Sequence, residues 1–517
     1  MKKILSFIAS FILLISIGFS QISVQNNNPT KNSLQEECGF DSRHNQLMIT
    51  DPIYKQKTNE FNALMLKGGI NNKMGTVYRV PVVVHVMYKG EAVGNGSNIS
   101  DAAINQGILQ LNERYRKVAG SLGDGNGVDV EIEFALAVRD ESNSCTNGIV
   151  RYDMSAHSNY MNFGMNYSNS NGMDESTLKG LSRWNPNLYY NIYLVYEIDD
   201  NECGFGIQGF AYLSGAHGNS VDGMVQLTCK FAESGNTTLT HELGHAFNLY
   251  HTFQGDGGGS SCPSGSGDFC ADTPPHKRST SNCVVATNTC TGGSSNDHIH
   301  NYMDYSSDAC QSEFTSDQRT RARTALTGTR ASFLESNGNL SLVPPAPPVV
   351  DFSVSTTAIC LGTSVSFYDE STCIPNTYQN GPWTSISFSW TFDYGVNPAI
   401  LSTDQNPSLT FANAGTYNVT LEVTSGAGTD ILTKTSYVSV AAGTPTAACT
   451  PGSQNGPGNF GYALSNVTFE TINNTTSSGS NGVYADYSCT YATSVTEGSS
   501  YNLSVTLYTN NTYSEDV

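Results

Sequence analysis

Apolar residues between positions 75 and 335 follow the patterns of buried strands and amphipathic helices. Residues 77–88, VYRVPVVVHVMY, are a mostly apolar run typical of a central strand, and runs at 130–138 and 189–198 predict two further strands. Apolar residues at helical spacing predict a long helix from Ser100 onward; they are Ile104, Ile108, Leu111, Tyr115 and Val118. This order of elements predicts an α/β (α+β) domain with a mixed sheet.

Two more helices are expected in the same region. One begins near Thr237, where Asn236 or Thr237 can cap it. The other covers residues 316–334 and closes the domain. Its predicted solvent-facing residues are Gln318, Arg319 and Arg323.

The pattern changes beyond residue 335. Residues 336–348 include PPAPP, which predicts a stiff, extended linker. Short alternating runs at 387–392 and 417–423, separated by Gly, Asn and Pro turns, predict an all-β sandwich over 349–440. Residues 441–517 are strand-rich as well.

The amino end has the form of a secretory signal. Two lysines precede an apolar run over residues 4–19, with small residues before Gln21, so residues 1–20 are predicted to be cleaved. The run is shorter than a membrane span and no stop-transfer charges follow it. We therefore expect a secreted, extracellular protein with no stable membrane insertion after signal removal, attached to a cell surface only through a region outside this chain.

Charge narrows the range of partners. The chain has 517 residues and a formal net charge of −20, and it contains no basic stripe. The electrostatic attraction that drives binding to a phosphate backbone is therefore missing, so nucleic acid is not an expected partner.

The run HELGHAFNLYH at 241–251 carries the main chemical signal. His241 and His245 lie four residues apart, so on a helix both imidazoles reach one metal ion, and His251 supplies a third. Glu242 is placed to take a proton from a water that the metal polarises. With ten histidines in the chain, this pattern arises by chance on the order of once in ten thousand. His85, in contrast, is expected to be a packed core residue.

The third histidine lies too far along to share the helical face. The chain must turn after His245, and Asn248 is the predicted turning point. Such a turn needs a left-handed backbone conformation, which asparagine tolerates best after glycine.

These residues resemble the metzincin metallopeptidases, although Asn248 stands where that pattern has glycine. The run NYMDY at 301–305 resembles the Met-turn, and with GDFCADTPP at 267–275 and CQSEFT at 310–315 the pattern is similar to the pappalysin-like members. The resemblance covers roughly 75–335. It implies a zinc-dependent endopeptidase that cleaves proteins or peptides.

The resemblance also assigns roles to single residues. Met303 would lie under the metal, and Tyr305 would be a displaceable ligand or a donor to the developing oxyanion. Asp308 would be the carboxylate of a specificity pocket that prefers arginine at the cleavage site. A turn-forming aspartate is the alternative for Asp308.

Residues 21–74 are polar and are expected to form a pro-segment. Pappalysin-like zymogens carry a Cys-Gly whose thiolate caps the zinc, and Cys38-Gly39 matches it. The alternatives are a disulfide between Cys38 and Cys145 and a cysteine without a functional role. All three interpretations start from thirteen cysteines, an odd number, in an exported chain.

Family spacing implies disulfides between Cys262 and Cys290 and between Cys283 and Cys310, and it leaves Cys270 unassigned. The other expected pairs are Cys203–Cys229, Cys360–Cys373 and Cys449–Cys489.

Acidic residues in the loops after the zinc motif predict a second metal. Asp256, Asp268 and Asp272 supply hard oxygen ligands, and relatives bind calcium around these loops, so Ca2+ is expected beside Zn2+. The alternative is that all three are solvated loop residues.

Two resemblances concern the carboxyl-terminal part. WTFD at 390–393 and GTYNVTL at 415–421 resemble the PKD domain, with Trp390 expected in its core. Segments at 472–475, 484–487 and 497–503 resemble the beginning of a GEVED-type module within 441–517.

Two classes of function follow. The first is a secreted zinc endopeptidase made as a zymogen. The second is a surface adhesin or polymer-binding protein whose metallopeptidase domain is inactive or incidental. A third, narrower option is a zinc hydrolase that acts on a non-peptide bond, against which only the family resemblance argues. The intact Glu242 favours the first, because a pseudoenzyme is expected to lose its base before its metal ligands.

Overall fold

The computed structural model describes the following residues: 38–69, 75–168, 171–231, 233–265, 267–279, 283–284, 287–290, 296–334, 340–375, 386–395, 399–442, 462–475, 496 and 498–509. The predicted signal peptide, the first part of the pro-segment, the 484–487 segment and the Cys449–Cys489 pair lie outside these residues.

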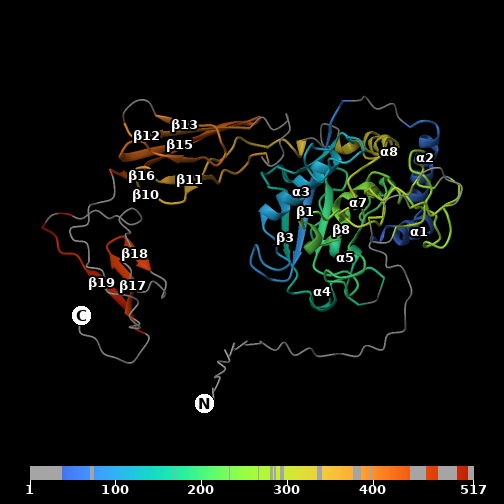
Figure 1. The fold of residues 1–517 in the computed structure, drawn as a ribbon, viewed down its shortest axis with the longest axis horizontal. Coiled ribbons are helices and arrows are strands. Elements are labelled where there is room, and N and C mark those ends of the chain that lie inside the picture. The colour runs from blue at the N-terminus through green and yellow to red at the C-terminus, as the bar shows by residue number, and fades with distance from the viewer. Residues whose placement is uncertain are drawn as a thin grey trace, which may run out of the picture. The chain divides into compact units, whose positions relative to one another are not determined.

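A six-stranded mixed sheet organises the first half of the described chain, as predicted (Figure 1). Its strands are β1 (Tyr78–Tyr88), β2 (Ile132–Leu136), β3 (Ile149–Asp153), β6 (Tyr190–Val195), β7 (Gly209–Phe210) and β8 (Met224–Leu227). The order is β2-β1-β6-β8-β7, and β3 pairs with β1 as well. All pairs are parallel except β7 with β8, so the edge strand β7 runs against its neighbour.

Helices cover one face of this sheet. Alternate β1 residues, beginning at Val80, pack with α3 (Asp101–Tyr115), α7 (Thr238–Ala246) and α8 (Ser316–Thr327) in one core. Ser100 caps α3 by accepting a hydrogen bond from the Ala103 amide. The period of two along the strand therefore meets the apolar stripe of each helix.

Shorter elements complete this part of the chain. They are α4 (Ser158–Phe163), β4 (Met165–Asn166), β5 (Met173–Asp174), α5 (Glu175–Gly180), the 3-10 helix η1 (Ser214–Ala216), α6 (Thr228–Phe231) and the 3-10 helix η2 (Ala331–Phe333). No described helix is long and apolar enough to cross a membrane.

The closing helix differs from its prediction. It ends at Thr327, and two of its three expected solvent-facing residues are buried. Gln318 forms a capping box with Thr315, and the Arg323 guanidinium reaches the Thr76 carbonyl and the Glu131 carboxylate at 2.8 and 3.0 Å. The polar groups of Gln318 and Arg323 have partners inside the domain. The prediction from helical periodicity that both side chains face solvent was therefore wrong.

Two helices precede the sheet, where the sequence predicted only a polar segment. They are α1 (Phe40–Thr50) and α2 (Pro52–Leu66), and Figure 1 shows both in blue at the right of the view. Asp51 caps α2 by accepting from the Ile53 and Tyr54 amides. Just before α1, Gly39 donates its amide to the Gly209 carbonyl at 2.9 Å, so this segment extends the sheet beyond β7.

A β-sandwich follows, as predicted. One sheet has the order β10-β16-β15-β12-β13 and the other β14-β11-β9. The strands are β9 (Phe352–Val354), β10 (Ala358–Cys360), β11 (Ser364–Asp369), β12 (Ser387–Asp393), β13 (Ile400–Ser402), β14 (Ser408–Thr410), β15 (Gly415–Ser425) and β16 (Gly428–Ala441). Trp390 is fully buried between the sheets, as expected of a core residue.

The last described elements form a three-stranded antiparallel sheet. It consists of β17 (Tyr462–Phe469), β18 (Ile472–Thr475) and β19 (Leu503–Thr509), in the order β18-β17-β19. The resemblance to a GEVED-type module stays a prediction.

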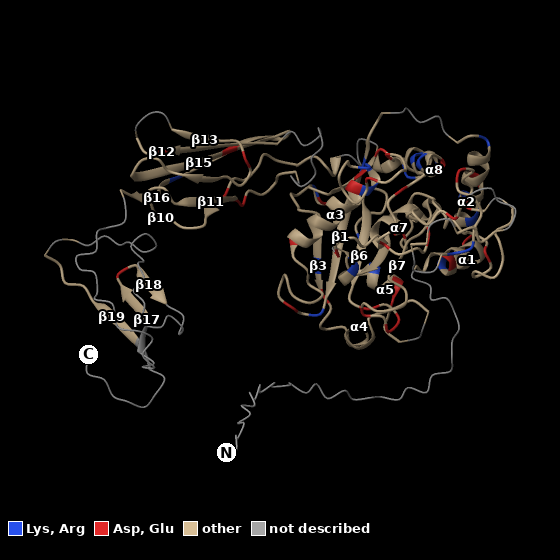
Figure 2. Ribbon diagram, viewed as in Figure 1, with Lys and Arg blue, Asp and Glu red and all other residues tan. Residues whose placement is uncertain are grey.

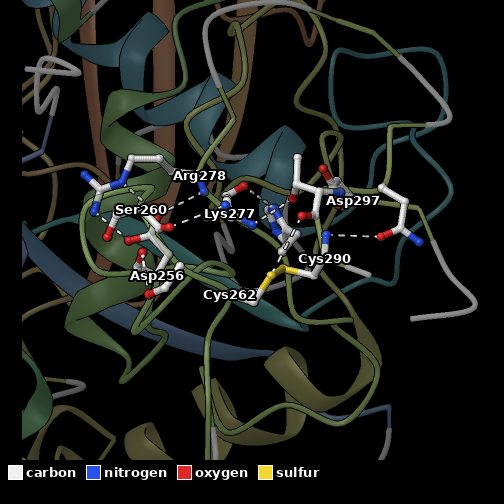
Figure 3. Close-up of a disulfide and its surroundings, with 11 residues drawn as sticks. Asp256, Ser260, Cys262, Lys277, Arg278, Cys290 and Asp297 are labelled. Atoms are coloured by element: carbon white, nitrogen blue, oxygen red, sulfur yellow. Dashed lines mark hydrogen bonds and ion pairs between the residues drawn. A yellow bond between two sulfur atoms is a disulfide. The ribbon is translucent and has the colours of Figure 1, made fainter. Parts of the chain in front are cut away.

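The disulfides confirm three predicted pairs and correct one. Cys203–Cys229, Cys262–Cys290 and Cys283–Cys310 are bonded (Figure 3 for the second), and Cys38 and Cys270 are free. Cys373 is bonded to Cys145 and not to Cys360, which is itself disulfide-bonded. The predicted Cys360–Cys373 pair was wrong, because sequence proximity favours local bridges and the true pair spans 228 residues. The same bond excludes a disulfide between Cys38 and Cys145.

Charged side chains are sparse along the described ribbon (Figure 2). One pair is completely enclosed: the Arg330 guanidinium binds both oxygens of Asp222 at 2.7 and 2.8 Å. Burial alone would raise the pKa of Asp222, but Arg330 lowers it well below its usual range.

We expect Asp222→Ala to lower the free energy of unfolding by about 3–5 kcal/mol, because it leaves Arg330 buried without its carboxylate. Denaturant unfolding of the full chain measures the change. Glu233→Ala, which removes an exposed partner of Lys230, is the control and should cost below about 1 kcal/mol. The depressed folded-state pKa means that the Asp222 contribution is present above its unfolded pKa and is lost as pH falls. Equal effects of the two substitutions would contradict this account.

Candidate metal centre and active site

Two imidazoles project from one face of α7 in matching orientations. The Nδ1 atoms of His241 and His245 lie 2.7 and 2.8 Å from the carbonyls of Tyr302 and Leu249. Each ring therefore donates through Nδ1 and directs Nε2 away from the helix, and the two Nε2 atoms are 3.2 Å apart. Such backbone partners fix the tautomer in which Nε2 is free to ligate a metal.

The chain turns at Asn248, as predicted. Asn248 has φ +66°, and its side-chain oxygen accepts the Ser214 amide at 2.7 Å. Glycine could supply the conformation but not this hydrogen bond. The turn brings His251 back, so that its ring centroid lies 4.7 Å from that of His245 and 5.1 Å from that of His241.

Cys38 completes a buried cluster with the three histidines. One ligand atom from each of Cys38, His241, His245 and His251 lies within 4.8 Å of the other three, and Cys38 Sγ is 3.5 Å from His245 Nε2. Three nitrogens and one sulfur at this separation are a donor set that suits zinc.

The protonation states favour a cation in this cluster. Burial lowers the pKa of His241 to about 3 and holds that of His245 well below its usual range, so both imidazoles stay neutral. Burial also raises the pKa of the adjacent Glu242 to about 8, against the smaller effect of a hydrogen bond with the Cys38 thiol, and no nitrogen or oxygen donor of the described residues reaches its carboxylate. A buried carboxylate without such donors is costly unless a positive charge lies close by, so these residues fit a metal dication.

Met303 packs directly beneath the helix. A Cβ added at Gly244 would meet the Met303 sulfur at 2.3 Å, so the absence of a side chain at Gly244 admits the methionine. Asn301 holds the turn that carries Met303: its amide exchanges two hydrogen bonds with Gln318, at 2.8 and 2.9 Å. The capping box of α8 thus also fixes the floor of the site.

Tyr305 faces the same centre. Its ring lies edge-on to His251 with centroids 5.0 Å apart, and its hydroxyl donates to the Cys38 carbonyl at 3.3 Å. The phenol is therefore aimed at a carbonyl of the chain that enters the site.

Two segments of the chain match known protein families. Residues 171–327 match the peptidase M43 family, described as pregnancy-associated plasma protein-A, and residues 345–440 match the PKD domain. The chain carries an M43 peptidase domain. The pappalysin-like and PKD resemblances are confirmed, and the protein is a metallopeptidase by family.

Relatives of this M43 domain include extracellular enzymes. An extracellular metalloprotease from Neurospora crassa is 29% identical over 291 residues, covering 55% of this chain and 85% of the relative. One from Colletotrichum graminicola is 52% identical over 84 residues, or 16% of this chain and 28% of its own length. Mature mirolysin from Tannerella forsythia, solved with a cleaved peptide, is 31% identical over 52% of this chain and 99% of that chain, with a TM-score of 0.43.

Residues before the M43 domain contact the cluster closely. The Phe40 ring stacks on His245 with centroids 3.9 Å apart, and the Asp41 carboxylate lies 3.3 Å from His251 Nδ1 and accepts from Gln254 at 3.1 Å. Asp41 was not predicted as a site residue, although its position three residues after Cys38 could have indicated it. Gly209 was not predicted either; an added Cβ there would lie 3.1 Å from the Glu242 side chain.

The M43 domain places Asp308 at the amino end of α7. Its carboxylate accepts the Thr237 amide at 3.2 Å, the Asn236 side-chain amide at 3.1 Å and the Thr237 hydroxyl. Asp308 thus caps the metal-bearing helix from outside it. Its predicted role in arginine preference stays a prediction.

The three loop carboxylates do not converge among the described residues. Asp256 binds the Arg278 guanidinium with both oxygens at 2.9 Å (Figure 3). Asp268 accepts from the Cys270 amide and the Thr273 hydroxyl, and Asp272 accepts from Thr315 and Asp317. Protein donors thus contact each of them, and calcium binding stays a prediction.

We expect Asn248→Gly to cost about 1 kcal/mol of stability, because the turn is kept and only the hydrogen bond to Ser214 is lost. Asn248→Ala should cost about 1 kcal/mol more, because alanine resists positive φ. Denaturant unfolding measures both. An alanine variant as stable as the glycine variant would show that the left-handed turn is not the constraint.

Proposed function

We propose that this chain is a secreted zinc endopeptidase of the metzincin type, made as a zymogen and cleaving protein or peptide substrates. The observation that supports it most is the convergence of His241, His245 and His251 beside the buried Glu242, which no nitrogen or oxygen donor of the described residues contacts. Zinc bound there would polarise both a water and the substrate carbonyl. The extracellular relatives support export.

Three residues would have separate roles in peptide-bond hydrolysis. Glu242 takes the proton of the attacking water and passes it to the leaving amine. Tyr305 donates its hydroxyl hydrogen to the oxyanion that develops on the substrate carbonyl. Asp308 gives a preference for arginine at the cleavage site. The alternative is a surface adhesin whose protease domain is catalytically inactive, and the presence of Glu242 argues against it.

We expect Glu242→Gln to keep bound zinc and to lower peptide hydrolysis by about 10²–10⁴-fold, because the side-chain volume stays and the base is lost. Hydrolysis of a mixed peptide library, followed by mass spectrometry, and zinc content by atomic emission measure the two effects. His245→Ala should lose zinc and activity together. A Glu242→Gln variant that cleaves at the parent rate would remove Glu242 from the mechanism.

The precursor is held inactive by residues 38–41. Cys38 occupies the fourth position of the cluster, Phe40 covers His245, and Asp41 lies against His251. Burial and the charge of Glu242 raise the pKa of the Cys38 thiol, so a metal must displace its proton before the thiolate binds. Removal of the segment would open the position for water.

We expect Cys38→Ala to raise the activity of the uncut precursor, and Asp41→Asn to raise it less. Alanine removes the sulfur ligand, whereas asparagine removes only the charge beside His251 and weakens the hold of the segment. Initial rates on a peptide substrate, with intact precursor verified by mass, measure both. Cys270→Ala, at the other free cysteine of the described residues, and Asn45→Ala, at an exposed position of α1, are the controls. No activation by Cys38→Ala would exclude the cysteine switch.

A further inference from the structure

An arginine of the pro-segment lies in a pocket of the M43 domain. The Arg43 guanidinium carbon is 4.5 Å from the centroid of the Tyr167 ring and 5.6 Å from that of the Phe210 ring. Its Nη2 donates to the Tyr167 carbonyl at 3.1 Å, and its Nε lies 3.6 Å from the Glu175 carboxylate. A cation is thus enclosed by an aromatic face, a carbonyl and a carboxylate.

The pocket wall is held rigidly by its own domain. Glu175 begins α5, accepts the Tyr212 hydroxyl at 2.7 Å and pairs with the buried Lys179 at 2.8 Å. The rings of Tyr167 and Phe210 pack on each other with centroids 5.2 Å apart. These contacts do not involve Arg43, so the pocket does not depend on its present occupant.

The segment that enters the catalytic centre also contacts the residues of this pocket. Phe210 follows Gly209 in β7, and the Gly209 carbonyl accepts the amide of Gly39, which adjoins Cys38. Tyr167 also donates its hydroxyl to the Gly39 carbonyl. The chain that enters the metal site therefore places the Arg43 side chain beside the same edge strand.

We propose that this pocket, formed by Tyr167, Glu175 and Phe210, is a substrate subsite for a guanidinium side chain, and that Arg43 occupies it in the precursor. The proposal rests on the peptidase function above and extends it. It differs from the expected role of Asp308, whose carboxylate binds the amino end of α7.

The chemistry selects arginine over lysine. A planar guanidinium stacks on Tyr167 while its N–H groups reach the carbonyl and Glu175, whereas an ammonium is a strongly hydrated point charge. Lys179 already neutralises Glu175, so the occupant gains from the ring face and the carbonyl as well as from charge. A neutral side chain of the same shape should therefore bind more weakly, but not be excluded.

Strand direction sets the position in the substrate. Cys38 pairs with Gly209 in the parallel sense. A substrate that pairs with β7 in the antiparallel sense has its amino-terminal side next to Phe210 and beyond. The preferred arginine then lies upstream of the cleaved bond.

The test uses the full chain matured by cleavage of its pro-segment. Peptides with arginine, lysine or citrulline at each upstream position are compared by kcat/KM, because citrulline keeps the planar shape without the charge. One upstream position should prefer arginine over citrulline roughly tenfold. Tyr167→Leu and Glu175→Gln should each lower that ratio towards one. Tyr196→Leu, which removes a ring that lies under Lys89 instead, is the matched control and should leave the ratio unchanged.

Binding separates the two proposals. The affinities of the same peptides for the matured Glu242→Gln chain are measured by fluorescence polarisation, which needs no hydrolysis. An arginine preference in affinity that Tyr167→Leu abolishes supports the subsite even if the parent chain cleaves nothing, and that result would overturn the peptidase instead. Parent cleavage or binding with an arginine-to-citrulline ratio near one, or a ratio that neither pocket variant changes, would overturn the subsite.

Discussion

The burial of Glu242 beside His241, His245 and His251 is the constraint on which the site depends. No nitrogen or oxygen donor of the described residues reaches its carboxylate, and burial raises its pKa to about 8 against the smaller effect of a hydrogen bond with Cys38. Without a neighbouring cation such a group takes up a proton, and with one it becomes a base. The surrounding structure accommodates this group: Gly209 leaves room for the carboxylate, and Met303 packs closely against Gly244.

The same cleft explains how the pro-segment binds. Groups that are poised for a substrate find substitutes in residues 38–43: a sulfur at the metal cluster, a carbonyl for Tyr305 and a backbone amide for the Gly209 carbonyl. In the proposed zymogen, each of these contacts would fill a position that catalysis requires to be vacant. The proposed latency would then need only occupation of the site by residues 38–43, without distortion of the M43 domain.

The sequence predicted those features whose determinants are local. The run at 241–251 carries its ligands, base and turn within eleven residues, so periodicity and spacing suffice. Features that depend on distant contacts could not be predicted in this way. Arg323 was read as solvated because its partners at Thr76 and Glu131 lie far away in sequence, and the Cys145–Cys373 bond spans 228 residues. The apolar pattern of helices α1 and α2 is weak because these helices pack on the surface of another part of the chain. They were therefore not predicted from the sequence.

In its proposed role, Asp308 would link specificity to the metal site. One of its oxygens accepts the Thr237 amide and hydroxyl, and the other accepts the Asn236 amide. A carboxylate has about four lone-pair positions, so an arginine side chain could share the second oxygen without displacing these bonds. Because Thr237 is the first residue before α7, any movement of Asp308 towards a substrate cation would act on the helix that carries His241 and His245. Substrate selection and metal geometry are therefore expected to be coupled through this carboxylate, and not to vary independently.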